Sequence, residues 1–164
     1  MRRVGLILVL VAVATAAAAA TDEPPLTPDG WGGLRVGMDE KAAIRRFGLR
    51  VVDSIEADCH VLAVPRHRGV KVMALGGRID SVVVSGRSRI RTNRGLGVGS
   101  RESEVIGAYG RGLRIEPNHY LDPPAHYLTW RPDPQGRGVM YETDETGRVA
   151  IIHAGGDSIA YTDG

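Results

Sequence analysis

The sequence predicts an α+β fold produced by tandem duplication of one unit, in which a short helix is followed by an antiparallel meander of three to four strands. Residues 33–48 and 95–110 carry the same glycine-framed pattern, with identical residues at seven of the aligned positions. A second match, between residues 77–83 and 147–153, follows in the same order at an offset that is eight residues larger. Two ordered blocks with preserved internal spacing indicate an internal repeat with a net insertion in the second copy.

Each copy is predicted to begin with a glycine turn and a short helix. Apolar residues recur at spacings of one and four residues, which place them on one helical stripe; they are Ala43, Ile44 and Phe47 in the first copy and Val105, Ile106 and Tyr109 in the second. Ser100 is the expected N-cap of the second helix, and Met38 holds the same place in the first. Gly48 and Gly110 are placed to end the helices in the left-handed conformation.

Strands are expected to follow each helix, with turns at glycine-containing segments. The expected ranges are 59–64, 70–75, 79–84 and 89–92 in the first copy, and 126–130, 138–142, 148–153 and 158–162 in the second. Residues 111–125 contain three prolines and predict a long loop, or a loop with a short edge strand. One helix on one small sheet buries little, so we expect the two units to stack or to join edges into a larger sheet.

The first twenty residues have the composition of a secretory signal peptide. Arg2 and Arg3 form a positive start, residues 4–13 are almost wholly apolar, and the small residues 18–20 offer a cleavage site before Thr21. An uncleaved membrane anchor is the alternative, which the shortness of the apolar stretch disfavours. We therefore expect a periplasmic or secreted protein without stable membrane insertion once the signal is removed.

These patterns give an expected organisation in four parts, which are a signal peptide at 1–20, an N-terminal linker at 21–32, repeat unit 1 at 33–94 and repeat unit 2 at 95–164. The hydrophobic core has to hold the fold, because the chain has a single cysteine, Cys59. That thiol is expected to be either a buried free side chain or one half of an intermolecular disulfide.

The charge of the mature chain excludes one class of partner. The chain has 21 basic and 19 acidic residues, and residues 1–20 hold two arginines and no acid, which leaves 21 − 2 = 19 bases against 19 acids. This balance gives no support for binding nucleic acid or another polyanionic partner. Residues 21–91 carry a net +3 (12 bases, 9 acids) and residues 92–164 a net −3 (7 bases, 10 acids), a polarity that is able to orient a partner.

The residues that carry chemistry form no motif above background. Neither Gly-x-Ser-x-Gly nor Ser-x-x-Lys occurs, and the glycines of residues 95–99 are followed by Ser100, where the dinucleotide pattern needs glycine. Five histidines match no zinc template, although His60 and His126 fall in equivalent expected strands. We therefore predict no catalytic residue, no metal site and no cofactor.

Two groups of residues are candidates for binding a partner. In an extended strand Arg87, Arg89 and Arg91 point to one side and, with Arg94 nearby, form a basic ridge. That ridge either blunts an exposed sheet edge against aggregation or contacts an acidic partner, such as lipid headgroups or a protein. The second group consists of aromatic side chains around the proline-rich segment, namely Tyr120, Tyr127 and Trp130.

The glycine-framed helices at 33–48 and 95–110, each followed by a strand meander, resemble the small outer-membrane-assembly lipoprotein family and the tandem β-lactamase inhibitor protein fold. The resemblance implies a periplasmic protein that works by contacting other proteins. The chain departs from the lipoproteins because it has no lipidated cysteine after the signal, and from the inhibitor fold because it has no pair of cysteines.

Together these observations predict a non-enzymatic module of the bacterial envelope that binds another envelope protein through its sheet face and the 111–137 loop. The alternative is a small-ligand or cell-wall-glycan binder, or an enzyme, that uses a cleft between the two units. A deep pocket that collects His126, Tyr127 or Arg89 would favour the alternative, and a shallow exposed sheet would favour protein binding. A purely structural envelope protein is the third interpretation.

Overall fold

The computed structural model describes residues 23–132, 136–156 and 159. Within them the backbone is mostly β, with eight strands in one antiparallel sheet and two short strands in a separate ribbon, whereas each of the two α-helices has eight residues. The expected signal peptide at 1–20 lies outside the described residues, as does the expected strand at 158–162 apart from Ile159. No helix in the described stretches is long and apolar enough to cross a membrane.

The chain order places one α-helix ahead of each group of four sheet strands. The elements are β1 (Gly30–Trp31), β2 (Leu34–Arg35), α1 (Glu40–Phe47), β3 (Arg50–Glu56), β4 (Cys59–Ala63), β5 (Val70–Leu75), β6 (Arg78–Ser85), α2 (Glu102–Tyr109), the 3₁₀ turn η1 (Gly110–Gly112), β7 (Leu113–Pro117), β8 (His126–Trp130), β9 (Gly138–Thr143) and β10 (Val149–Gly155).

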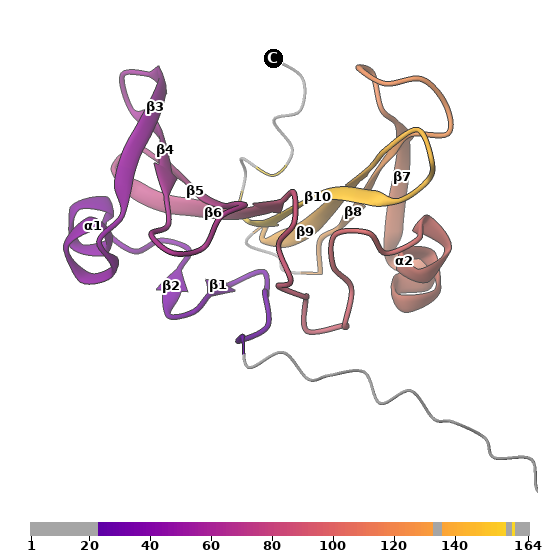
Figure 1. The fold of residues 1–164 in the computed structure, drawn as a ribbon, viewed down its shortest axis with the longest axis horizontal. Helices are drawn as coiled ribbons and strands as arrows, with labels where there is room; N and C mark the ends of the chain where they lie inside the picture. Colours follow the sequence, from indigo (N-terminus) through magenta and orange to yellow (C-terminus); the bar gives the residue numbers. More distant parts are fainter. Residues whose placement is uncertain (1–22, 133–135, 157–158, 160–164) are drawn as a thin grey trace, which may run out of the picture.

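The eight-stranded sheet has the order β3-β4-β5-β6-β10-β9-β8-β7. Its centre is the antiparallel pair β6 and β10, in which Val83 lies opposite His153 and Val84 opposite Ile152. The hairpin β3–β4 and the hairpin β7–β8 with its loop 118–125 rise on the same side of the sheet (Figure 1). We call these two hairpins the arms. Helices α1 and α2 lie at the two ends of the molecule, on the side away from the arm tips (Figure 1).

The predicted fold class is wrong. The sequence predicts an α+β protein built from duplicated helix-plus-meander units, whereas the structure is mostly β and has one continuous sheet. The edge strands β3 and β7 add to the β content, and the helices are too short to balance it. Buried residues from both groups of strands belong to one hydrophobic cluster, so the sheet covers a single core.

Strand β3 was not among the expected strands, and all seven of its residues are exposed. The segment therefore lacks the alternation of apolar and polar residues that marks a half-buried strand. The strand expected at 89–92 does not form, because Arg91 and Thr92 make only isolated bridges, to Gly97 and Leu26. Residues 86–101 instead link β6 to α2 across one face of the molecule (Figure 1).

The N-caps of the two helices lie one residue later than predicted. Asp39 caps α1, and its carboxylate accepts a hydrogen bond from the backbone N–H of Ala42 at 2.8 Å. Arg101 holds the N-cap position of α2, and the carboxylate of Glu104 accepts its backbone N–H at 2.6 Å. The expected roles of Met38 and Ser100 are therefore wrong.

Of the two glycines predicted to end the helices in the left-handed conformation, Gly48 has that conformation and Gly110 has a different one. Gly48 ends α1 in the left-handed conformation, with φ 64° and ψ 31°. Gly110 also has a positive φ of 57°, but its ψ of −136° leads the chain into η1. Both positions use backbone angles that glycine adopts without steric cost.

Alternation along the strands sends two sets of side chains to the two sides of the sheet. The side that carries the helices holds the main core, in which the largest buried sheet residues are Leu62, Ile79, Leu128, Tyr141 and Ile152. Side chains at the intervening positions point to the other side, which we call the helix-free face. The helices therefore cover only one side of the sheet.

One glycine next to the sheet offers a test of this geometry. Gly69 has φ +84°, and a Cβ built there would lie 2.3 Å from the backbone oxygen of Ser85. We expect Gly69→Ala to lower the free energy of unfolding by about 2 kcal/mol or more. Gly107→Ala is the matched control: nothing lies within 4 Å of its Cβ position in α2, and we expect a gain of about 0.5–1 kcal/mol. Urea unfolding measures both changes, and equal effects would contradict the close approach.

Candidate functional site

The helix-free face has an apolar floor on its β4–β6 side. The register sets Val61 opposite Met73 and Cys59 opposite Leu75, so these four side chains share the face. Met73 and Cys59 are half-buried and Leu75 is exposed, whereas Val61 is buried. On the next strand Val83 continues this floor. Lys71 lies opposite Val83 and Ser81 opposite Met73 on this same face, so the floor is partly open and mainly apolar with one exposed charge.

A histidine–glutamate pair lies near the middle of this face. The Nε2 atom of His153 on β10 is 2.6 Å from Oε1 of Glu142 on β9. Both side chains are mostly buried, with 19% and 17% of their surfaces exposed. Because each group satisfies the other, the pair adds a polar point to the floor without leaving a buried charge unpaired.

The β8–β9 part of the helix-free face is covered. Tyr127 and Met140 form a second small core with Ile159, and the exposed fraction of Tyr127 is 5%. The Tyr127 hydroxyl donates to the side-chain oxygen of Asn118 at 3.1 Å. The ring of Tyr127, a predicted binding residue, is therefore part of the interior and is not presented to a partner.

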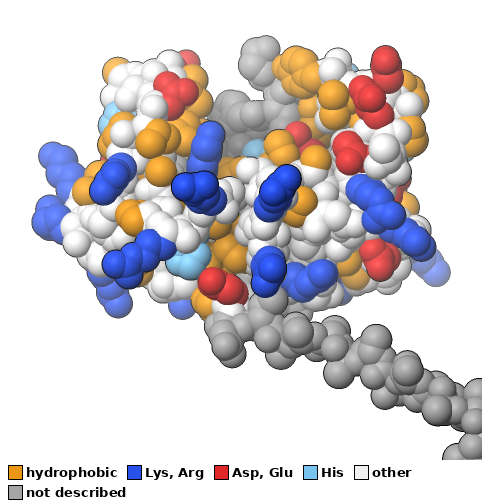
Figure 2. Space-filling model, in the orientation of Figure 1, with side chains coloured by type: hydrophobic (Ala, Val, Ile, Leu, Met, Phe, Trp, Pro, Cys, Tyr) orange, Lys and Arg blue, Asp and Glu red, His pale blue; other side chains and the backbone are white. Residues whose placement is uncertain are grey.

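Exposed apolar side chains concentrate on the two arms. Seven of the eight large hydrophobic residues that are exposed in the described chain lie on the arms or at the end of β5, and the eighth is Ile106 on α2. The seven are Val51, Val52, Ile55, Leu75, Ile115, Tyr120 and Leu121. Figure 2 shows apolar surface on both arms. Both arms therefore present apolar side chains to solvent.

The predicted aromatic residues have three different environments. Tyr120 is 66% exposed, in the loop between β7 and β8. Trp130 is half-buried, with its ring centroid 4.9 Å from that of Tyr109. The guanidinium of Arg94 lies over both rings, 4.4 Å from the Tyr109 centroid and 4.9 Å from the Trp130 centroid. This stack ties β8 to α2, so Trp130 packs within the fold and Tyr120 is the accessible aromatic.

The predicted basic ridge does not lie on a strand. Arg87 occupies the turn after β6 and Arg89 lies in irregular backbone. Arg91 forms an isolated β-bridge with Gly97. All three are exposed. Arg91 lines an open pocket together with Arg101 and Arg148, which the sequence reasoning missed. The signal that could have found this basic region is the absence of any acidic residue from 81 to 101.

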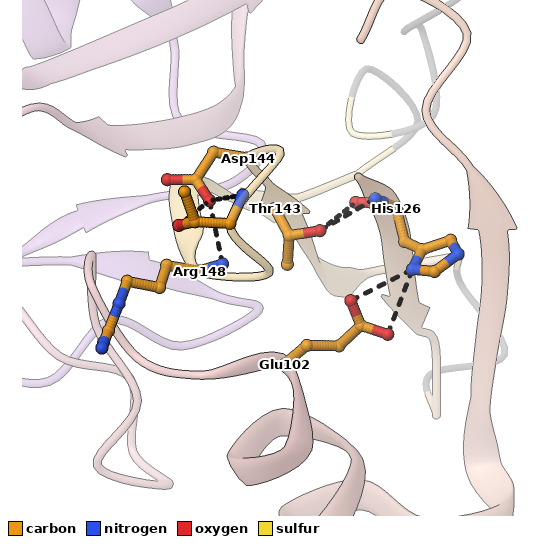
Figure 3. A network of polar contacts seen from close by, with 6 residues as sticks. Glu102, His126, Thr143, Asp144 and Arg148 are labelled. Atoms are coloured by element: carbon orange, nitrogen blue, oxygen red, sulfur yellow. Dashed lines mark hydrogen bonds and ion pairs between the residues drawn. The ribbon is translucent and has the colours of Figure 1, made fainter. Parts of the chain in front are cut away.

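Two other histidines join helix starts to strands. Nδ1 of His60 on β4 is 2.7 Å from Oε1 of Glu40, and Nδ1 of His126 on β8 is 3.0 Å from Oε2 of Glu102. Figure 3 shows the second pair, with Glu102 reaching up from α2 to the imidazole. Each histidine thus anchors the helix that lies next to it. The described residues contain no group of three metal-ligating side chains.

His126 also connects to the turn before β10. Its backbone N–H donates to the Thr143 hydroxyl at 2.8 Å, and the next residue, Asp144, accepts the backbone N–H groups of Thr146 and Arg148 at 2.9 and 3.0 Å (Figure 3). A further bond from the Thr146 hydroxyl is the main cause that lowers the pKa of Asp144, followed by the Arg148 backbone bond. These bonds to the Asp144 carboxylate hold the turn in one conformation, which fixes the position from which the Arg148 side chain extends.

Two of the residues named for an inter-unit cleft, His126 and Tyr127, do not face a common pocket. His126 and Tyr127 are neighbours on β8 and point to opposite sides of the sheet. His126 contacts Glu102 on the helix side, and Tyr127 packs against Met140 on the other. These groups do not converge on one pocket.

Cys59 is half-buried on the helix-free face, and it is a free thiol. Burial raises its pKa, and the carboxylates of Glu56, Asp58 and Asp80 add to that effect. A thiol whose pKa is raised stays protonated at neutral pH and is a poor nucleophile. The side chain is more accessible than the expected buried thiol.

Comparisons with known proteins bear on the fold alone. No protein-family model and no curated protein matches the chain. An extracellular protein containing an SCP domain from Bacillus anthracis strain Ames matches with a TM-score of 0.50 and 8% identity, over 91% of this chain and 51% of that one. A cysteine-rich secretory protein from Staphylococcus aureus strain Mu50 gives a TM-score of 0.41 and 15% identity, over 84% and 49%. The chain spans about half the length of each.

The first of these matches corrects the expected resemblance. The sequence pattern suggested the outer-membrane-assembly lipoproteins and the β-lactamase inhibitor protein fold, whereas the fold is similar to that of the extracellular SCP-domain protein. The glycine-framed helix that suggested those families specifies a turn and a helix end, and such features recur in unrelated folds.

The buried tyrosines predict how stability depends on pH. The hydroxyl groups of Tyr109 and Tyr141 are 2.8 Å apart, and Tyr141 donates to Thr92 at 3.3 Å. Burial raises the pKa of both tyrosines above the ordinary value of 10.0. Above pH 10 the unfolded chain therefore loses these protons while the folded chain keeps them, so the free energy of unfolding falls as the pH rises.

Tyr141→Phe tests this account. The variant removes the more strongly shifted group, so its free energy of unfolding should fall less steeply above pH 10 than that of the wild type. At neutral pH it should lose about 1 kcal/mol through the missing hydrogen bonds. Urea unfolding across the pH range, with tyrosinate absorbance, measures both effects. Identical slopes in the two proteins would contradict the assignment.

Proposed function

We propose that this chain is an exported, non-enzymatic module of the bacterial envelope that holds another protein between its two arms. The observation that carries the proposal is the concentration of exposed apolar side chains on both arms. Monomeric soluble proteins rarely expose contiguous apolar patches, and such patches mark interaction surfaces. The partly open apolar floor of β4–β6 continues the same surface between the arms.

The chemistry of this surface supports a protein partner over a small ligand. The exposed arm residues are apolar, and the floor combines apolar side chains with Lys71, Ser81 and the His153–Glu142 pair, which is satisfied internally. Small-ligand sites usually hold a few polar groups that converge on one point. Protein interfaces instead spread apolar and aromatic contacts over a broad area, and Val52, Ile55 and Tyr120 are placed in that way.

The composition of the first twenty residues supports the proposed export. When the full chain is expressed in a bacterium, we expect secretion with a mature N-terminus at Thr21, because signal peptidase needs the small residues at 18 and 20. Mass spectrometry of the exported protein determines that N-terminus. Replacing Ala18 and Ala20 with leucine should block cleavage. A wild-type chain that stays uncleaved in the cytoplasm would contradict export.

Paired substitutions in the arms test partner binding. Val52→Asp with Ile55→Asp changes one arm, and Tyr120→Ser with Leu121→Ser changes the other. Loss of such contacts typically weakens an interface by about 2 kcal/mol or more, which is more than tenfold in affinity. We expect each double variant to reduce, by about tenfold, the amount of a stoichiometric partner that the tagged, exported protein retains from envelope extract.

Ile106→Asp provides the matched control for these variants. Ile106 is 39% exposed, similar to the 42% of Leu121, but it lies on α2 and not on an arm. This variant should retain the partner as the wild type does, and urea midpoints should show that all three variants fold. If the arm variants and Ile106→Asp behave alike, or if no stoichiometric protein is retained, the arms are not a protein-binding site.

A further inference from the structure

An open pocket of about 490 Å³ lies where three separate segments meet. The segment that links β6 to α2 contributes Arg91, the N-cap of α2 contributes Arg101, and the start of β10 is preceded by Arg148. Glu104 is the acidic residue in the pocket lining. The pocket is on the helix side of the sheet, away from the face between the arms.

Two of the three guanidinium groups are held in place by backbone oxygens. Nη1 of Arg91 donates to the carbonyl of Gly95 at 2.8 Å, and Nη1 of Arg148 donates to the carbonyl of Gly99 at 2.9 Å. Each bond uses one of the five N–H groups of an arginine. The remaining N–H groups stay available for a ligand, and the side chains do not have to be ordered when it binds.

The positive charge of the pocket is not neutralised by its surroundings. Among the described residues, Arg91, Arg101 and Arg148 have no carboxylate partner, and the Arg101 guanidinium has no hydrogen-bond partner either. The carboxylate of Glu104 accepts the backbone N–H of Arg101. Glu104 forms no ion pair with a guanidinium, and with three arginines and one glutamate the pocket lining keeps a net charge of +2.

The segment that supplies Arg91 and Arg101 is basic along its length. Residues 81–101 contain five arginines and no acidic residue, and the three that do not line the pocket, Arg87, Arg89 and Arg94, are exposed. Figure 2 shows several Lys and Arg side chains on the face below the arms. Because the chain as a whole is nearly balanced in charge, this local excess is a property of the surface and not of the composition.

We propose that this arginine pocket binds a phosphate group. The planar fork of arginine matches two oxygens of a phosphate, and guanidinium–phosphate bonds are charge-assisted. Three guanidinium groups in the lining of one pocket suit the three or four oxygens of a phosphate better than the two of a carboxylate. The phosphate can be free, part of a soluble ester, or part of a lipid headgroup, because all three present the same oxygens.

The test is a set of titrations of the exported protein at low ionic strength. The probes are inorganic phosphate, glycerol 3-phosphate, and phosphatidylcholine vesicles with or without phosphatidylglycerol. We expect saturable binding of at least one phosphate probe by calorimetry or vesicle sedimentation. Arg101→Gln and Arg91→Gln should each weaken it by about tenfold, as expected for loss of one charge-assisted contact.

Two control variants separate the pocket from general basicity and from folding. Arg45→Gln removes an exposed arginine of α1 outside the pocket and should leave binding unchanged. Arg78→Gln removes the bond from Arg78 to the Gly37 carbonyl, which matches that of Arg148 to Gly99, so it reports the effect of losing such a bond outside the pocket. Urea midpoints show whether each variant folds.

The pattern of binding tests the proposal and identifies the source of the phosphate. Binding of the soluble probes that depends on Arg91 and Arg101 supports a free phosphate or ester, and binding of phosphatidylglycerol vesicles alone with the same dependence supports a lipid headgroup. Absence of saturable binding to every probe would overturn the proposal. So would binding that survives both pocket variants, or that falls equally in Arg45→Gln.

Discussion

The antiparallel ladder between β6 and β10 is the contact on which the rest of the structure depends. It joins strands that lie about seventy residues apart in sequence, through five residue pairs from Ile151–Ser85 to Gly155–Ser81. Without it each four-stranded group would have an open edge and a core too small to persist. With it, the two groups share one buried cluster, and their remaining edges, β3 and β7, lie at opposite ends of the sheet. The placement of the two arms follows from this arrangement.

The parts of the fold that the sequence predicts correctly are those with a local signal. The hairpins at 70–84 and 138–153 have apolar alternation and glycine turns, and α1 and α2 have glycines at their ends. β3 has no buried side, so its residues show no alternation that periodicity could detect. The sequence therefore predicts too little strand. Burial patterns do not reveal an edge strand of this kind, whereas helix caps have clear sequence signals.

The functional surfaces were harder to predict than the strands because they combine residues from distant segments. The arginines at 87, 89 and 91 drew attention as a local run, but the pocket takes one of them and adds Arg101 and Arg148 from two other elements. Tyr127 and Trp130 looked like surface aromatics, and tertiary packing withdraws both from full exposure. The histidines at 60 and 126 were noticed for their equivalent positions, and what they contact is a glutamate at the start of each helix. That contact cannot be read from strand sequence alone.

The two register shifts in β3 have a consequence for solubility. They fall between Val51 and Asp53 and between Ser54 and Glu56, on an edge strand whose side chains are all exposed. Such bulges bend a strand and interrupt its row of backbone donors and acceptors, which makes it a poor template for another strand. The chain can therefore keep Val52 and Ile55 in water without presenting a regular edge on which copies would polymerise. The irregular backbone edge offers an extended peptide no regular row of hydrogen-bond donors and acceptors. Recognition at this arm therefore has to act through the shapes of side chains.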